Sequence, residues 1–204
     1  HSCQKILAEH WKPWLENTGV ILEDATCYET DMRFPTDVKL LWECNEWIYN
    51  QIKLLCKYSR IRRPRSKFSE QKQKYLSYQR CRKKSYKETI RRIRSLLYLL
   101  EKLIGQLTDI EKIAQKKGYC FPTRYYKRTD TINKIFSQQQ QMYKTKKTVS
   151  NRIVSIAKDY IRPIIRGKET KRLEFGSKVN MIQVDGINFI DHLSFDAFNE
   201  CKRF

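Results

Sequence analysis

Two apolar, β-branched runs joined by Asp185-Gly186 constrain the fold of this chain more than any other feature. They belong to the segment L-E-F-G-S-K-V-N-M-I-Q-V-D-G-I-N-F-I-D-H-L, residues 173–193. Asp-Gly between such runs is typical of a two-residue hairpin turn, because both central residues of that turn need positive φ. We therefore predict antiparallel strands over 173–184 and 187–193.

A second strand segment is predicted near the N-terminus, over residues 20–25. It reads V-I-L-E-D-A, and Gly19 precedes it as a turn residue. The apolar start of this run predicts a buried strand that ends near Asp24. At the other end of the chain, Ser194-Phe195-Asp196 is typical of a helix start, so we predict that a helix follows the hairpin.

The residues between these strand segments have the periodicity of helices. Apolar side chains recur at spacings of three and four after Pro35-Thr36-Asp37, until Pro64 interrupts the pattern. The same spacing returns later, and Gly118 is expected to end the longest run. Further helices are predicted over 70–84, 86–117 and 123–143.

The predicted fold class is therefore α+β, with a long helical insertion between strands. We divide the chain into an N-terminal helix and first strand over 1–36, a basic helical insertion over 37–160, and a hairpin with the start of a helix over 161–204. Together these segments predict a single truncated domain. The chain begins with His and not Met, which leads us to expect a piece of a longer protein.

Charge is concentrated in the middle of the sequence. The chain has 42 Lys and Arg against 22 Asp and Glu, a net charge of +20. Residues 57–94 hold 16 bases and two acids, whereas residues 1–50 hold nine acids and four bases. Such a field favours a polyanionic partner, nucleic acid before an anionic membrane. No run of 18 apolar residues is present, so no bilayer-spanning segment is predicted.

The basic stretch has two interpretations, a phosphate-contacting surface or a solvated helix face. We favour nucleic acid, because a helix with so few acids would repel itself without a counter-charge. Tyr75, Tyr78 and Tyr86 lie among these cations, where they can stack or pack. The predicted DNA-binding residues of this stretch are Arg60, Arg62, Arg63, Arg65, Lys67, Arg80, Arg82, Lys83, Lys84, Arg91 and Arg92.

A second basic segment, I-R-P-I-I-R-G-K-E-T-K-R, follows at residues 161–172. Arg162, Arg166 and Lys168 either reach the same ligand or belong to a surface linker. The seven cysteines form no C-x-x-C pair, so neither a zinc site nor a disulfide framework is predicted. Reduced thiols in a cytosolic protein are the expectation.

Asp24 also has two interpretations. Aspartate is common at strand ends and turns, which is a purely structural role. A carboxylate held by a strand is also a good ligand for Mg²⁺, and phosphoryl transfer on DNA uses two such ions. One Asp cannot hold two ions, so the second interpretation requires further ligands. Asp31, Asp37, Asp185 and Asp196 have turn, capping or ion-pairing roles, with Arg33 a partner for Asp31 or Asp37.

Three segments resemble bacterial insertion-sequence DDE transposases. They are D-A-T-C-Y-E-T-D-M-R-F-P-T-D-V-K-L-L at 24–41, R-I-V-S-I-A-K-D-Y-I-R-P-I-I-R-G-K-E at 152–169, and E-F-G-S-K-V-N-M-I-Q-V-D-G-I-N-F-I-D-H-L-S-F-D-A-F-N-E at 174–200. The resemblance implies a partial RNase H-like core interrupted by the basic insertion. It also implies that Asp24 is the first catalytic, metal-binding Asp. The family's second Asp and its Glu would lie beyond Phe204.

The expected function is therefore that of a transposase fragment. The resemblance implies Mg²⁺-dependent DNA cleavage and strand transfer, with two Mg²⁺ ions in the intact enzyme and DNA as transposon ends and target. The parent would be an enzyme in the bacterial cytoplasm, associated with the nucleoid, while the fragment alone would be inactive. Self-association is an open expectation. The alternative is a non-catalytic nucleic-acid-binding module or an inactive transposon remnant.

Overall fold

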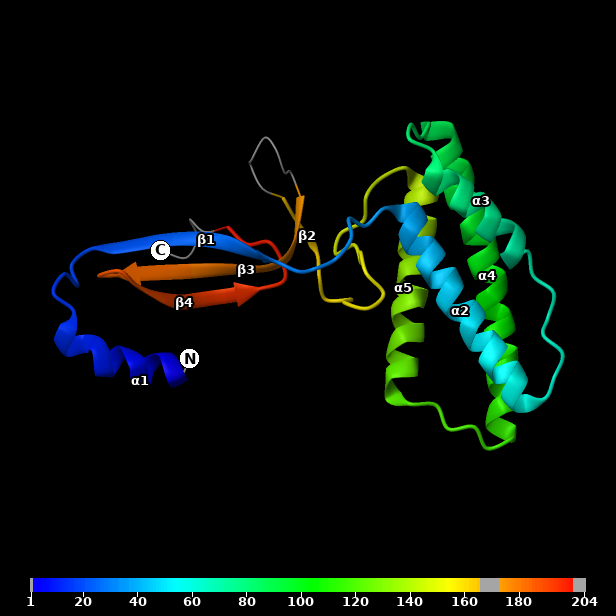
Figure 1. Cartoon of the computed structure of the whole chain (residues 1–204), viewed down its shortest axis with the longest axis horizontal. Coiled ribbons are helices and arrows are strands. Elements are labelled where there is room, and N and C mark those ends of the chain that lie inside the picture. The colour runs from blue at the N-terminus through cyan, green and yellow to red at the C-terminus, as the bar shows by residue number, and fades with distance from the viewer. Residues whose placement is uncertain (1, 166–172, 200–204) are drawn as a thin grey trace. The chain divides into compact units, whose positions relative to one another are not determined.

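The computed structural model describes residues 2–165 and 173–199. The chain divides into two compact units, residues 33–159 and residues 1–32 with 160–204 (Figure 1), here called the helical unit and the sheet unit. The mixed α+β class is confirmed. The helical unit contains α2 (Asp37–Ser59), α3 (Phe68–Arg80), α4 (Tyr86–Lys116) and α5 (Thr123–Thr145). The sheet unit contains α1 (Ser2–Trp11), the 3-10 turn η1 (Lys12–Trp14), β1 (Ile21–Glu29), β2 (Pro163–Ile165), β3 (Leu173–Val184) and β4 (Ile187–Ser194).

The helical unit is organised around α4, which packs against α2, α3 and α5. Its core is aliphatic, with Leu41 and Leu55 of α2 and Leu100 and Leu103 of α4 fully buried. Asn45 lies in this core at 0% exposure, and its Nδ2 donates to the carbonyls of Leu41, 2.8 Å away, and Leu96, 3.1 Å away. This amide therefore ties α2 to α4 in addition to the apolar contacts.

Helix boundaries follow the local signals in the sequence. Thr36 Oγ1 accepts a hydrogen bond from the Lys39 N–H at 3.4 Å, and Ser85 Oγ accepts one from the Glu88 N–H at 3.2 Å, which satisfies donors that a helix start leaves unpaired. Gly118, with φ of 80°, follows α4 as predicted. The prediction for α3 was wrong in its limits, because it begins at Phe68 and ends at Arg80 instead of covering 70–84.

The sheet is antiparallel, and β3 pairs with all three other strands. The predicted hairpin is confirmed: β3 and β4 are joined by Asp185 and Gly186, whose φ values of 48° and 80° are both positive. Gly176 of β3 is required where β1 passes, because a Cβ there would lie 1.9 Å from the Tyr28 carbonyl oxygen. The N-terminal strand and the hairpin therefore form one sheet, although the whole helical unit separates them in sequence.

Two predictions about the sheet unit were wrong. The first strand extends to Glu29, so Asp24 is its fourth residue and not its end, and the apolar Ile21 and Leu22 are 63% and 59% exposed instead of buried. The predicted helix after Ser194 is absent from the described residues 195–199. Tertiary contacts hold that segment instead: the Phe195 ring lies 4.7 Å from that of Tyr160.

The buried thiol of Cys44 is expected to make the helical unit less stable as the pH becomes alkaline. Cys44 is 0% exposed, and burial raises its pKa above the ordinary thiol value. A raised folded-state pKa gives stability that is complete below the unfolded-state pKa and is lost as pH rises. Above about pH 8.5 we therefore expect the free energy of unfolding to fall by about 1.4 kcal/mol per pH unit from this thiol.

Urea unfolding between pH 8 and 10, followed by tryptophan fluorescence, measures this slope. Cys44→Ala is expected to remove it, at a cost in stability that is independent of pH. Cys120→Ala is the matched control, because that thiol is exposed and its removal is expected to leave the slope unchanged. An identical alkaline slope in wild type and Cys44→Ala would show that the thiol does not titrate on unfolding.

Candidate nucleic-acid interface and candidate metal ligand

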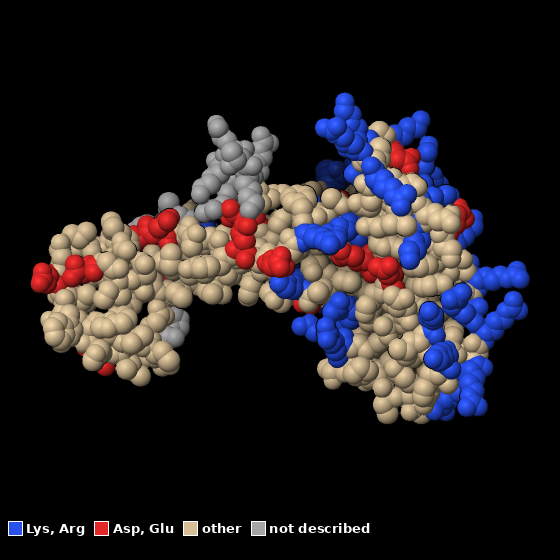
Figure 2. All heavy atoms as spheres, in the orientation of Figure 1, with Lys and Arg blue, Asp and Glu red and all other residues tan. Residues whose placement is uncertain are grey.

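The positive charge of the chain lies in the helical unit. Residues 33–159 hold 32 Lys and Arg against 10 Asp and Glu, a net charge of +22, whereas the remaining residues hold 10 against 12, a net charge of −2. Figure 2 shows Lys and Arg side chains gathered over α2 to α5 on the face in view. Because this excess exceeds the net charge of the whole chain, any polyanion is attracted to the helical unit first.

Nine of the predicted DNA-binding residues are exposed cations without an ion pair to any described residue. They come from the two connections that flank α3. The first connection carries Arg60, Arg62, Arg63, Arg65 and Lys67, and the second, with the end of α3, carries Arg80, Arg82, Lys83 and Lys84.

The two connections lie at opposite ends of α3. That helix has 13 residues, so it separates the two groups of cations by roughly 20 Å at 1.5 Å per residue. Phosphates on one DNA strand are about 3.4 Å apart along the axis. A single duplex lying along α3 would therefore meet both groups, with several phosphates between them.

The other predicted DNA-binding residues have different surroundings. Arg91 is exposed and its Nη1 donates to Glu88 Oε2 at 3.1 Å, whereas Arg92 is only 7% exposed and its Nε lies 3.0 Å from Glu88 Oε1. Arg162 is half-buried in the sheet unit, and its Nη1 donates to the Ile161 carbonyl at 3.1 Å. Arg166 and Lys168 lie outside the described residues.

Of the three tyrosines that were expected to stack or pack among these cations, two pack inside the helical unit. Tyr75 stacks on Trp42 with ring centroids 4.8 Å apart, and the buried Tyr78 shares a hydrogen bond with Thr89 at 2.9 Å between hydroxyl oxygens. Tyr86 remains, at 73% exposure. Packing and not ligand stacking therefore explains most of the aromatic content of this stretch.

Sequence reasoning missed cations outside residues 57–94. Residues 95–159 add 13 bases against five acids, including the exposed Arg124 and Lys127 beside the half-exposed Tyr126. Counting charge over the whole insertion would have found them. Arg33 was expected to pair with Asp31 or Asp37, and Asp37 instead accepts hydrogen bonds from Arg152 and Gln139.

Asp24 lies on β1 opposite Met181 of β3 and is exposed. Side chains alternate across a strand, so Asp24 shares a face of the sheet with Thr26 and Met181. Glu23 points to the other face, where the Nδ2 of the buried Asn180 donates to its carboxylate and, at 3.2 Å, to Asp191 Oδ2. The neighbouring carboxylates of Glu23 and Asp24 are therefore divided between the two faces.

The described residues contain no group of three or more His, Cys, Asp or Glu side chains that could hold a metal ion. Asp24 thus contributes one carboxylate to its face of the sheet. In the parts of the chain that the structure describes, no helix has the length and apolar character needed to cross a bilayer. No family model matches the chain, and neither a curated protein nor a solved structure matches it.

Proposed function

We propose that this chain is the DNA-binding part of an insertion-sequence transposase, in which the helical unit grips DNA and the sheet unit supplies one ligand of a catalytic metal site. The observation that carries the proposal is the net charge of +22 on residues 33–159. Nine exposed cations at the two ends of α3 have no carboxylate partner among the described residues, so they are free to neutralise phosphates.

The proposed role of Asp24 is supported by its exposure and by its place on a strand. Rigid strands position ligands more accurately than loops do. One carboxylate does not make a two-ion site, so the described residues alone do not fit two Mg²⁺ ions. The proposal therefore assigns Asp24 a single ligand position. The two other acidic ligands are those that the transposase resemblance implies on later segments of an RNase H-like core.

DNA binding by the helical unit is tested through its salt dependence. We expect the logarithm of the affinity to fall against the logarithm of salt concentration with a slope of several units, roughly 0.9 for each phosphate neutralised. Arg62→Gln with Arg65→Gln should lower that slope by up to about 1.8 and weaken binding on the order of tenfold per lost contact at 0.1 M salt. Fluorescence anisotropy with a labelled duplex measures both quantities.

Lys5→Gln with Lys12→Gln provides the matched control. It removes the same charge from the sheet unit, at residues that are exposed on α1 and η1. We expect this control to retain the wild-type slope. An equal loss of slope in both double variants would mean that net charge alone, and not the helical unit, determines binding. A flat salt response of the wild type would contradict DNA binding through phosphates.

A non-catalytic DNA-binding module is the second candidate function. The same charge distribution favours it, because phosphate neutralisation needs the helical unit and no metal ion. Such contacts position a protein on DNA without reading its sequence. Both candidates predict association with the bacterial nucleoid, and they differ in whether Asp24 is needed for strand cleavage.

A further inference from the structure

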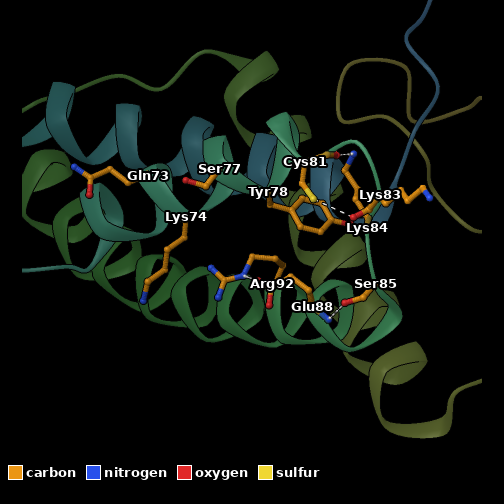
Figure 3. A pocket seen from close by; sticks show the side chains of 10 residues that line it. All are labelled: Gln73, Lys74, Ser77, Tyr78, Cys81, Lys83, Lys84, Ser85, Glu88 and Arg92. Atoms are coloured by element: carbon orange, nitrogen blue, oxygen red, sulfur yellow. Dashed lines mark hydrogen bonds and ion pairs between the residues drawn. The ribbon is translucent and has the colours of Figure 1, made fainter.

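A cleft lined by residues with polar or charged side chains lies between the C-terminal half of α3 and the first turns of α4. Its volume is about 630 Å³, within the usual range of ligand sites. Four cationic side chains line it, those of Lys74, Lys83, Lys84 and Arg92, against the carboxylate of Glu88. Figure 3 shows Lys74 on α3, Arg92 and Glu88 on α4, and Lys83 and Lys84 on the connection between these helices. The lining therefore carries a formal charge of +3.

Arg92 is the unusual member of this lining. It is 7% exposed, and Figure 3 shows its guanidinium between α3 and α4, on the cleft side of α4. Its Nε lies 3.0 Å from Glu88 Oε1 without the alignment of a hydrogen bond, so the Nε–H is a buried donor with no hydrogen-bond partner among the described residues. Glu88 divides its charge between Arg91 and Arg92. The positive charge of the buried Arg92 guanidinium is therefore only partly balanced by the Glu88 carboxylate.

The cleft also receives the positive end of a long helix. Ser85, the N-cap of the 31-residue α4, lines the cleft, and its hydroxyl accepts the Glu88 N–H. The N–H groups of Tyr86 and Lys87 in the same first turn have no carbonyl partner within the helix. The helix dipole adds a partial positive charge at this point. Phosphate groups bind readily where such a helix start meets cationic side chains.

Contacts within the connection between α3 and α4 hold the Lys84 side chain in place. Cys81 Sγ donates to the Lys83 carbonyl at 2.9 Å, and Lys84 Nζ donates to the Cys81 carbonyl at 3.0 Å while lying 5.5 Å from the centre of the Tyr78 ring. Lys83 has no side-chain partner among the described residues. The lining is thus partly ordered before any ligand binds, which lowers the entropy cost of binding.

We propose that this cleft is a phosphate-binding site in which Arg92, Lys83 and the N-terminal turn of α4 hold the phosphoryl oxygens. The cleft has room for the sugars on either side of a phosphate, so the proposed occupant in the nucleic-acid complex is one backbone phosphate of a strand. That second statement rests on the proposed function. The first, a site for the phosphate group itself, stands without it.

The test uses the thiol of Cys81, which lines the cleft and is exposed. Cys81 alkylation by iodoacetamide is followed by peptide mass spectrometry in the 204-residue chain, with inorganic phosphate replacing chloride at constant ionic strength. Phosphate is expected to slow alkylation of Cys81 severalfold. Cys3 and Cys120 are also exposed but lie away from the cleft lining, so their alkylation rates should stay constant. No protection of Cys81 by phosphate would overturn the site.

Two variants are expected to change the affinity of the cleft for phosphate in opposite directions. Lys83→Gln with Lys84→Gln should raise the phosphate concentration needed for half-protection at least about tenfold, since a charge-assisted hydrogen bond contributes about 1.5 kcal/mol or more. Glu88→Gln should lower it up to about fivefold, because it removes the carboxylate that competes for Arg92. A merely damaged cleft would weaken phosphate binding in both variants, and that result would overturn the assignment.

The matched control is Lys72→Gln with Lys102→Gln. Both lysines are exposed, lie on α3 and α4, and are absent from the cleft lining. Their loss should change half-protection by less than about twofold, because they act only through the screened general field. An effect as large as that of the Lys83 and Lys84 substitutions would show that the general charge, and not the cleft, holds phosphate.

A final arm separates this site from the proposed function. A 20-base-pair duplex replaces inorganic phosphate, and DNA affinity is measured in parallel by anisotropy. Protection of Cys81 by both ligands supports a backbone phosphate in the cleft. If inorganic phosphate protects Cys81 but a bound duplex does not, the occupant is not a backbone phosphate of DNA, and the cleft is a site for free phosphate. DNA binding without any phosphate protection overturns the cleft alone, whereas phosphate protection without DNA binding overturns the proposed function alone.

Discussion

Replacing Asp24 by alanine is expected to reduce Mg²⁺-dependent DNA cleavage by about 10³-fold or more, in a chain that also carries the two further acidic residues implied by the transposase resemblance. A carboxylate ligand would hold a metal ion that stabilises the charge of the reacting phosphate by several kcal/mol. Each 1.4 kcal/mol changes the rate about tenfold. DNA affinity should stay within a fewfold of wild type, because the phosphate contacts are assigned to the helical unit. Gel assays of strand cleavage and anisotropy of binding measure the two quantities.

Glu29→Gln is the control for this experiment. Glu29 is exposed on the same strand, and its odd spacing from Asp24 places it on the opposite face of the sheet. Its replacement removes the same charge from β1 but should leave cleavage near the wild-type rate. Full activity of Asp24→Ala would show that Asp24 is an ordinary strand residue. The non-catalytic module would then be the better account of the chain.

Leu100→Ala is expected to destabilise the helical unit by about 3 to 5 kcal/mol. Leu100 is fully buried on α4, the helix that contacts all three other helices of the unit. Its truncation removes apolar contacts and leaves a cavity that the surrounding helices fill only in part. Because the cations at the ends of α3 are held by this core, DNA affinity at a given temperature should fall with the folded fraction.

Leu54→Ala is the matched substitution at the surface. Leu54 lies on α2 and is 47% exposed, so the expected loss is about 1 kcal/mol or less. Urea unfolding followed by circular dichroism at a helical wavelength compares the two variants. A similar cost for Leu54→Ala and Leu100→Ala would contradict the arrangement of the core around α4.

Most of the element types were predictable because the signals for them are local. The 3.6-residue periodicity of the insertion, the caps at Thr36 and Ser85, and the positive φ required by Asp185-Gly186 act over a few residues each. The long helix predicted over 86–117 is α4, Tyr86–Lys116, and the hairpin strands agree within one residue. The limits of α3, the extent of β1 and the helix expected after Ser194 were misjudged, since these features depend on contacts with distant parts of the chain.

The candidate metal ligand shows where local reasoning ends. An Asp after an apolar run predicted a strand end, but pairing with β3 carries β1 five residues further, to Glu29. The helix expected after Ser194 fails for a related reason. Phe198 lies against the ring of His192, with centroids 4.9 Å apart, and its carbonyl accepts from Lys178 Nζ at 2.8 Å. These tertiary contacts outweigh a helix-start signal of only a few residues.

The α+β class, the order of helices and strands, and the concentration of positive charge in the insertion could be predicted from local signals, because periodicity, turn chemistry and net charge need no knowledge of distant contacts. Which of the described cations are free and which are paired with a carboxylate follows from the folded arrangement of the helices. Arg92 is buried beside Glu88 while Lys83 is exposed, and Asp37 meets Arg152 across 115 residues of chain. Burial and pairing depend on which segments fold against one another, and that information is spread over the whole chain.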